Sequence, residues 1–263
     1  MNRVVVITGA SSGIGLKTAE LFKKNGDIVI NISKTEGTIA DRNYIADVSN
    51  SEEISVAFEK IKNEYGKIDV LINNAGYGMS GVTELLSNEE CENIFKVNYF
   101  GTLSCIKNAL PLMQKGGKII NLGSAMALFP IPFRAMYGAS KAAVVNLSYS
   151  LRMELKPLGI DVTVMCPGNT KTNFTKNRVK EFKTNERYGD RITIATNKID
   201  KGDDKRMSAN VVAKAIYKQA NKKHSKPMVI VGGKYKLLYF ISNIAPKSWL
   251  LNITGKIYDG RKK

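Results

Sequence analysis

The feature that most constrains the fold of this chain is a regular alternation of short apolar runs with longer amphipathic stretches. The apolar runs have the length of buried β-strands and occupy residues 4–7, 28–32, 69–72, 118–122, 161–165 and 228–231. The stretches between them repeat apolar residues at the helical period, over residues 16–25, 52–65, 88–113, 135–158 and 209–220. Strands that alternate with helices in this order need right-handed crossovers, which makes the strands parallel. The sequence therefore predicts an α/β fold, a doubly wound parallel sheet with helices on both faces.

Length and composition indicate a single domain. A chain of 263 residues with 43% apolar content can bury one large core, so we expect one domain over residues 1–263. Residues 169–208 are polar, basic and too long for an ordinary loop, and we predict a substrate lid there. Residues 232–263 form a basic amphipathic C-terminal segment. Its apolar stretch can pack in the core, rim a substrate pocket or touch a membrane surface.

The net charge of +17 raises the question of an acidic partner. Lysine and arginine are dense between residues 171 and 206 and again after residue 214, and no aromatic residues interleave with base-reading groups. This distribution argues against a nucleic-acid partner. A solvated surface, or attraction to an acidic small molecule or an anionic lipid, explains the charge better.

Cysteine and histidine usage bears on the compartment and on metal binding. The three cysteines, Cys91, Cys105 and Cys166, are odd in number and far apart, so we expect no disulfide framework and a reducing, cytoplasmic setting. No apolar run approaches the about 20 residues that span a bilayer. The lone His224 lies in a basic turn, and we expect neither a metal site nor a Ser-His-Asp triad around it.

A glycine-rich turn at residues 8–15 has the context of a phosphate site, because it follows a predicted strand and precedes a predicted helix. Its glycines allow a tight turn and a close approach to a pyrophosphate. The helix that begins near Gly13 points its N–H groups and its positive end at the same place. Such a turn is also found without a ligand, so further motifs are needed to decide.

Tyr137 and Lys141 supply the second motif. They lie four residues apart in a predicted helix, so their side chains share one face. An ammonium beside a phenol lowers the phenol's pKa, which is ordinarily about 10, and allows proton exchange near neutral pH. A pair with this spacing also arises by chance, and other residues must support the interpretation.

Taken together, the motifs resemble those of the short-chain dehydrogenase/reductase family, over roughly residues 3 to 172. The chain carries the family's turn at residues 8–15, its Asn-Asn-Ala-Gly strand end at 73–76 and its helix asparagine, Asn98. Ser124 then precedes Tyr137 by thirteen residues, and Pro167 begins a segment that leads to Thr172. The chain looks most like the NADP-dependent, hydroxysteroid dehydrogenase-like members. The resemblance implies a Rossmann fold and an enzyme that interconverts ketones and secondary alcohols.

The resemblance also implies four catalytic residues. Tyr137 would be the general acid in reduction and the base in oxidation, and Ser124 would hydrogen-bond the carbonyl oxygen. Lys141 would hold the nicotinamide ribose and lower the pKa of Tyr137, while Asn98 would hold a water for proton resupply. The chain departs from most relatives at Gly123, where they carry a second serine, and we expect the loss of a hydroxyl near the pyrophosphate.

Further residues are implied for the cofactor, in addition to Tyr137 and Lys141. They gather at the expected carboxyl ends of the strands and comprise Gly9, Ser11, Ser12, Gly13, Ile14, Gly15, Ser33, Lys34, Asp47, Val48, Asn74, Ala75, Gly76, Pro167, Gly168, Thr170 and Thr172.

The end of the second strand favours NADP(H), although NAD(H) stays possible. NAD enzymes of this architecture end that strand with an acidic residue, whereas this chain has Ser33 followed by Lys34, whose ammonium can neutralise a 2′-phosphate. Glu36 is the counter-evidence, and we interpret it as solvated. Asp47 and Val48 match the family's adenine contacts, and Asp47 could equally cap the following turn.

The predicted substrate is bulky and apolar or amphipathic, such as a steroid or another lipid. The segment between Ser124 and Tyr137 predicts an apolar wall of Ala125, Met126, Leu128, Phe129, Pro130, Ile131 and Phe133. The alternatives are a ketoacyl-carrier reductase, a general carbonyl reductase and, outside enzymes, a cofactor-sensing regulator. The intact Ser124, Tyr137 and Lys141 argue against the regulator.

Two expectations concern surfaces. Residues 88–113 and 135–158 resemble the helices through which family members pair, so we expect a homodimer or homotetramer. The lid would present a cationic cover that suits an amphipathic anion, although exposed charges often contribute little. Its cations are Lys171, Lys176, Arg178, Lys180, Lys183, Arg187 and Arg191.

Overall fold

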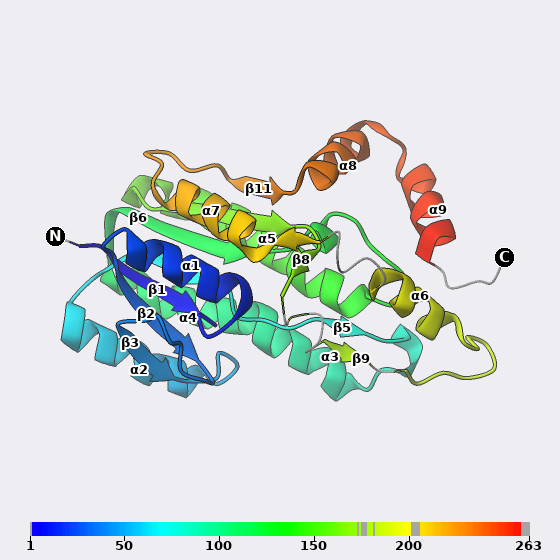
Figure 1. Cartoon of the computed structure of the whole chain (residues 1–263), viewed down its shortest axis with the longest axis horizontal. Coiled ribbons are helices and arrows are strands. Elements are labelled where there is room, and N and C mark those ends of the chain that lie inside the picture. Colours follow the sequence, from blue (N-terminus) through cyan, green and yellow to red (C-terminus); the bar gives the residue numbers. More distant parts are fainter. Residues whose placement is uncertain (1, 173, 175–177, 181, 201–205, 259–263) are drawn as a thin grey trace.

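The central sheet has the predicted parallel arrangement (Figure 1). The computed structural model describes residues 2–172, 174, 178–180, 182–200 and 206–258, and within them seven strands pair in the order β11-β7-β6-β4-β1-β2-β3. Every neighbouring pair in this sheet is parallel. The strands are β1 (Val4–Thr8), β2 (Ile28–Ser33), β3 (Arg42–Ile45), β4 (Ile68–Asn73), β6 (Met113–Leu122), β7 (Asp161–Pro167) and β11 (Met228–Val231). The single-domain, doubly wound fold is confirmed.

Both faces of the sheet are buried, which explains why its strands read as continuous apolar runs. Val4 and Val6 of β1 pack into the core on one face, and Val5 and Ile7 pack into the core on the other. The first face is covered by α2 (Ser51–Tyr65), α4 (Gly101–Ala109) and α5 (Ala135–Leu155), and the second by α1 (Gly13–Lys24) and α7 (Ala209–Ala220).

The order of the strands places a crevice at β1. The chain moves outward from β1 to β3, returns to β4 beside β1, and then moves the other way to β11. At such a reversal the connections on the two sides leave in opposite directions, which opens a crevice at the carboxyl ends of the strands.

The predicted elements need correction at two places. The edge strand β3 was not predicted, because its four residues bury only Tyr44 and carry no apolar run. Residues 88–113 are not one helix: α3 (Asn88–Phe95) leads through a π-helical turn (Lys96–Phe100) into α4, and Met113 already belongs to β6. The π turn inserts a residue into the helical period, which sequence periodicity does not resolve.

The predicted lid is more regular than its sequence indicated. It contains α6 (Arg191–Asp200), one short parallel pairing joins its two ends to each other, and a second ties it to the body of the protein. Strand β8 (Thr170–Lys171) pairs with β10 (Met207–Ser208), and β9 (Val179–Lys180) pairs with β5 (Met79–Ser80). Lys176 lies outside the described residues.

The chain continues after β11 into α8 (Gly233–Ile244) and α9 (Lys247–Tyr258), which project from the end of the sheet (Figure 1). Neither helix contains a fully buried residue, although Tyr235 and Tyr239 of α8 pack against the core beside β7 and β11. Among the described helices, none is both long and apolar enough to cross a bilayer.

The three cysteines are unpaired, and burial raises the pKa of Cys105 and of Cys166 to about 12.

Candidate active site

A cavity of about 890 Å³ follows the carboxyl ends of the central strands and extends to the C-terminal helices. Apart from Gly15 and Asn98, every predicted site residue lines it. They are Gly9, Ser11, Ser12, Gly13, Ile14, Ser33, Lys34, Asp47, Val48, Asn74, Ala75, Gly76, Ser124, Tyr137, Lys141, Pro167, Gly168, Thr170 and Thr172. The structure thus gathers residues from distant parts of the sequence into one continuous hollow.

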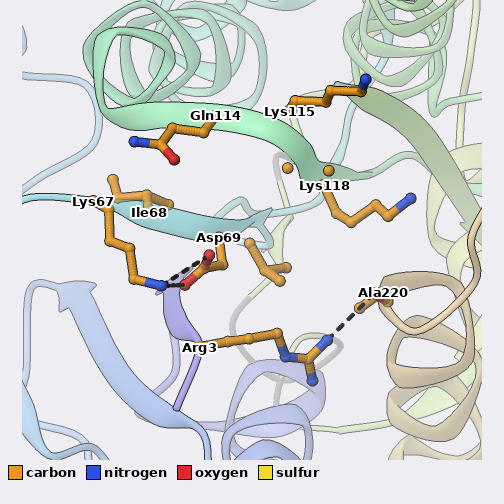
Figure 2. Close-up of a pocket in the computed structure, with 11 residues that line it drawn as sticks. Arg3, Lys67, Ile68, Asp69, Gln114, Lys115, Lys118 and Ala220 are labelled. Atoms are coloured by element: carbon orange, nitrogen blue, oxygen red, sulfur yellow. Dashed lines mark hydrogen bonds and ion pairs between the residues drawn. The ribbon is translucent and has the colours of Figure 1, made fainter. Parts of the chain in front are cut away.

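A second cavity, of about 280 Å³, lies at the opposite, amino-terminal edge of the sheet (Figure 2). Its lining includes Arg3, Lys67 and Lys118, which would suit an anion. These cations already bind carboxylates: Arg3 pairs with Asp27 at 2.8 Å, Lys67 with Asp69 at 3.0 Å and Lys118 with Asp161 at 2.7 Å. The first cavity is therefore the candidate site.

At its glycines the glycine-rich turn presents backbone without side chains to the cavity. Gly9 and Gly13 adopt φ values of 70° and 57°, a left-handed region that favours glycine. A Cβ on Gly15 would overlap the carbonyl oxygen of Gly9 and lie 2.6 Å from Nδ2 of Asn74. Gly15 thus acts by letting α1 pack against the turn rather than by lining the cavity.

Side chains from neighbouring strands hold this turn in place. The side-chain amide of Asn74 donates to the carbonyl oxygens of Thr8 and Gly9, at 3.0 and 3.1 Å. On the other side, the fully buried Asn31 of β2 accepts from the N–H of Ala10 at 2.9 Å and donates to Asn43 at 2.8 Å. Sequence reasoning missed Asn31, whose signal is a polar residue inside an otherwise apolar strand.

The turn fits a dinucleotide pyrophosphate. The first turn of α1 contains no acidic residue, so nothing on the helix opposes its positive amino-terminal end. Thr172 lies close by, because a Cβ on Gly13 would sit 3.4 Å from it. Helix N–H groups without intrahelical partners, a positive dipole end and close backbone approach at the glycines are what a phosphate anion needs.

The end of β2 carries a contact that the sequence did not predict. Lys34 forms an ion pair with Asp47 at 2.6 Å, and the same carboxylate accepts from the N–H and hydroxyl of Ser49. Lys34 holds the pKa of Asp47 below its ordinary value, against the opposing effect of burial. Ser33 is buried, and Glu36 is exposed and outside the cavity lining, as expected.

Tyr137 and Ser124 meet at the inner end of the cavity. Both side chains are buried, with 6% and 8% of their surfaces exposed. Burial raises the pKa of Tyr137, and a hydrogen bond with Ser124 and the charge of Arg134 oppose this rise. Phe174 lies against the phenol ring, with centroids 5.9 Å apart. The phenol is therefore protonated at neutral pH in this structure, as a general acid must be.

Lys141 and Asn98 lie behind the tyrosine. The ammonium of Lys141 donates to the carbonyl oxygen of Leu122 at 2.8 Å, and burial lowers the pKa of Lys141 to about 8. The amide of Asn98 donates to Tyr77 and to Ser140 and accepts from the N–H of Tyr77, each at 3.0 Å. Asn98 thus ties the β4 connection to α5, and its implied water-holding role stays a prediction.

Arg134 is the main site residue that sequence reasoning missed. It is 6% exposed, lines the cavity and places its guanidinium carbon 4.8 Å from the centroid of the Tyr137 ring. Phe133, just before it, has a φ of 62°, which is rare for a bulky residue and typical of functional sites. The available signal was its position three residues before Tyr137, at the N-cap of the helix that carries the tyrosine.

Comparison with known proteins identifies the family. A family model described as short chain dehydrogenase matches residues 3–183. The chain belongs to the short-chain dehydrogenase family. It is 37% identical over 254 residues to a 3-ketodihydrosphingosine reductase of Bacteroides thetaiotaomicron, covering 94% of this chain and 93% of that protein.

Solved structures agree with this assignment. A short-chain dehydrogenase from Streptomyces avermitilis superposes with a TM-score of 0.83 at 26% identity, covering 100% of this chain and 99% of that one. ElxO with NADP bound superposes with a TM-score of 0.74 at 27% identity, covering 90% of this chain and 100% of that one. The protein is therefore an oxidoreductase that acts on a carbonyl or on a CH–OH group.

Two details set this short-chain dehydrogenase apart from the expectations. A side chain on Gly123 would point toward β7, with its Cβ 3.0 Å from Val164 and 3.1 Å from Cys166. The missing serine thus makes room for packing rather than removing a hydroxyl from the pyrophosphate side. Phe133 does not belong to the cavity wall, whereas the other predicted wall residues do.

The predicted lid segment of this dehydrogenase is less cationic than its sequence indicated. Lys183 pairs with Glu90 and Arg187 with Glu84, each at 3.0 Å. Of the predicted lid cations that the structure describes, Arg178 lines the cavity, and it is 6% exposed. Arg178 and Arg134 thus reach the cavity from two different elements.

Replacing Arg134 tests its influence on Tyr137. Arg134→Met removes the positive charge beside the phenol, so the pKa of Tyr137 rises further. We expect the basic limb of the pH profile of kcat/KM for ketone reduction to move to higher pH, because the acid stays protonated longer. The profile for alcohol oxidation, which needs the phenolate, moves the same way. Arg191→Met, which removes the cation beside the Phe133 ring, is the control, and equal profiles for wild type and R134M would contradict the prediction.

Proposed function

We propose that this protein reduces the ketone of a long-chain lipid to a secondary alcohol with NADPH. The single observation that carries the proposal is the continuity of the cavity. It runs from the polar group around Tyr137 to an apolar wall on α9, which includes Leu250 and Ile257. A polar reacting end joined to a long apolar channel suits a ketone on an extended hydrophobic body.

NADPH, when held along the glycine-rich turn, would supply the hydride that the carbonyl carbon accepts. Ser124 donates a hydrogen bond to the carbonyl oxygen, where negative charge develops. Tyr137 gives its phenolic proton to that oxygen, so the ketone becomes an alcohol. Lys141 lies one helical turn from Tyr137. Its lowered pKa of about 8 lets it take part in returning a proton to the Tyr137 phenolate.

The proposed preference for NADPH rests on Lys34. Among the described residues that line the cavity, Asp47 is the one carboxylate, and Lys34 already neutralises it. The Lys34 side chain is 71% exposed, so its ammonium can turn from Asp47 to a 2′-phosphate at low conformational cost. An NAD enzyme of this architecture would place a carboxylate near Ser33 instead.

Lys34→Ala tests this preference. We expect NADPH to bind more weakly by about 1–3 kcal/mol, the range of a charge-assisted contact, while NADH binding changes little. Calorimetric titration with both cofactors measures the difference. Lys17→Ala is the matched control, since Lys17 pairs with Glu20 at 2.7 Å and lies outside the cavity lining. An equal loss for both cofactors would show that Lys34 does not recognise the phosphate.

The proposals for the substrate's alkyl chain and for its head group rest on different observations. The relative named as a 3-ketodihydrosphingosine reductase supports a ketone on a long alkyl chain. The head-group preference is supported by the described cavity lining, which holds several lysines and arginines against the one carboxylate of Asp47 and so favours an acidic or neutral group over a protonated amine. A steroid ketone with an acidic side chain satisfies the same chemistry and is the second candidate.

A matched panel of ketones tests the proposal. Long-chain 3-ketones with a carboxylate, a methyl ester or an amine at the head are compared with short-chain versions and with a carboxylated ketosteroid. We expect kcat/KM with NADPH to rise with chain length and the carboxylate to lead the amine. Its advantage over the ester should shrink at high salt. Equal kcat/KM values for long and short chains would overturn the lipid assignment.

We also propose a homodimer or homotetramer, assembled through the α4–α5 face, in the cytoplasm. Phe100 and Met153 on this face are 56% and 71% exposed, which supports burial against a second copy. The three unpaired cysteines support a reducing compartment. Light scattering at micromolar concentration should give a dimeric or tetrameric mass, and a monomeric mass would contradict the assembly.

A further inference from the structure

The two C-terminal helices carry apolar side chains on faces that nothing in the described chain covers. On α8, Leu237, Phe240 and Ile244 are 61%, 65% and 72% exposed, and their spacing of three and four residues places them in one stripe. On α9, Trp249, Leu251 and Ile257 are each more than half exposed. Monomeric proteins rarely leave so many large apolar side chains together in water.

The opposite face of α8 lies against the cavity. Tyr235, Leu238 and Ser242 line the cavity, and they follow the same helical spacing as the outer stripe. The helix therefore has one apolar face toward the cavity and another toward the outside. A helix that is apolar on two sides needs a second apolar environment.

The charge on these helices indicates which environment that is. Residues 233 to 258 contain Lys234, Lys236, Lys247 and Lys256 and no acidic residue. Lysines beside tryptophan, tyrosine and leucine on short helices are typical of segments that lie in the interface of an anionic bilayer. A second copy of this chain, with its net charge of +17, would be repelled by these lysines.

The cavity reaches the surface at the same place. Leu238, Leu251, Ile253 and Ile257 line the cavity and are nevertheless 37%, 52%, 38% and 51% exposed. The wall of the cavity is thus also part of the outer apolar surface. Figure 1 shows α8 and α9 together beyond the end of β11, away from the helices that cover the sheet.

We propose that α8 and α9 dock on the surface of an anionic lipid bilayer, so that the cavity opens toward the membrane. A lipid substrate would then enter between apolar surfaces without crossing water. The docking rests on the exposed stripe and the lysines alone, and only this route of entry rests on the proposed function.

Trp249 makes the proposal directly measurable, because it is the chain's single tryptophan. The protein is mixed with vesicles of phosphatidylcholine, with or without phosphatidylglycerol, in the absence of substrate. We expect sedimentation with the anionic vesicles, a blue shift of the tryptophan emission and quenching by brominated lipid chains. High salt should weaken the binding. Emission that is unchanged by anionic vesicles would overturn the proposal.

The double variant Phe240→Glu, Ile244→Glu keeps Trp249 as the reporter and leaves the cavity lining intact. We expect its partition onto anionic vesicles to fall by about tenfold or more, because two large apolar side chains no longer leave water. The matched control is Val56→Glu, Leu158→Glu, which has the same charge change at positions 55% and 59% exposed on other elements. An equal decrease in vesicle partition for the two double variants would show that the added negative charge alone weakens binding. That result would contradict docking by the stripe.

A second copy of the chain is the competing occupant. In that case Trp249 emission is blue-shifted without lipid, and the mass from light scattering falls in the F240E, I244E variant. That outcome would overturn the membrane proposal. Turnover of a short, water-soluble ketone is followed in parallel, so that a failure of docking is distinguished from a failure of the proposed reaction.

Discussion

Tyr137→Phe should lower the turnover of ketone reduction by about 100- to 10,000-fold, the usual contribution of a general acid. The substitution keeps the buried ring against Phe174 and removes only the hydroxyl that hydrogen-bonds Ser124. The folded state and the cofactor cavity stay intact, so the affinity for NADPH should change little. Steady-state kinetics and calorimetric titration on the same preparation separate the two effects.

Tyr149→Phe provides the control for this result. Tyr149 lies on the same helix, is partly buried and donates its hydroxyl to the sulfur of Met228, outside the cavity lining. Loss of this hydroxyl should leave turnover within a few-fold of wild type. Near-native turnover in Y137F would remove Tyr137 from the mechanism.

Gly15→Ala should destabilise the protein and abolish cofactor binding with a single methyl group. The new Cβ would overlap the carbonyl oxygen of Gly9, which Asn74 already holds through a hydrogen bond. Because the obstacle is backbone in a tightly bonded turn, we expect a loss of about 1–3 kcal/mol in unfolding free energy, as for overpacking in a core. The displaced turn should also weaken NADPH by more than tenfold, since its N–H groups no longer converge.

Gly255→Ala is the matched substitution. Gly255 lies within α9, and a Cβ there would have no heavy atom within 4 Å. Alanine favours the helix over glycine, so the stability of this variant should stay equal or rise slightly. Denaturant unfolding and cofactor titration compare the two variants. If G15A and G255A have the same unfolding free energy and the same affinity for NADPH, the tight contact at Gly15 has no role in stability or in cofactor binding.

Local sequence patterns predicted the parts of the fold whose causes are local. The strands beside β1 are apolar because both faces of the sheet are covered, so their continuous apolar runs could be recognised in the sequence. The glycine turn and the Tyr137–Lys141 spacing likewise depend on neighbours in the chain. The short edge strand β3 was not predictable in this way, because pairing with β2 rather than its own composition makes it a strand.

Long-range contacts account for what the sequence did not predict at the site. The ion pair of Lys34 with Asp47 joins residues from two connections. The inward position of Arg134 follows the left-handed backbone at Phe133, which no residue preference predicts. The neutralisation of Lys183 and Arg187 by Glu90 and Glu84 depends on how the lid folds over α3.

Transfer of an isotopic label tests the proposed reaction most directly. The enzyme is incubated with a long-chain ketone and NADPH that carries deuterium on one face of the nicotinamide, and the product is examined by mass spectrometry. We predict one deuterium at the former carbonyl carbon from one labelled face and none from the other, with labelled product forming about 100- to 10,000-fold more slowly in Y137F. Product without deuterium from either face, or labelling that survives in Y137F at the wild-type rate, would contradict hydride transfer at this site.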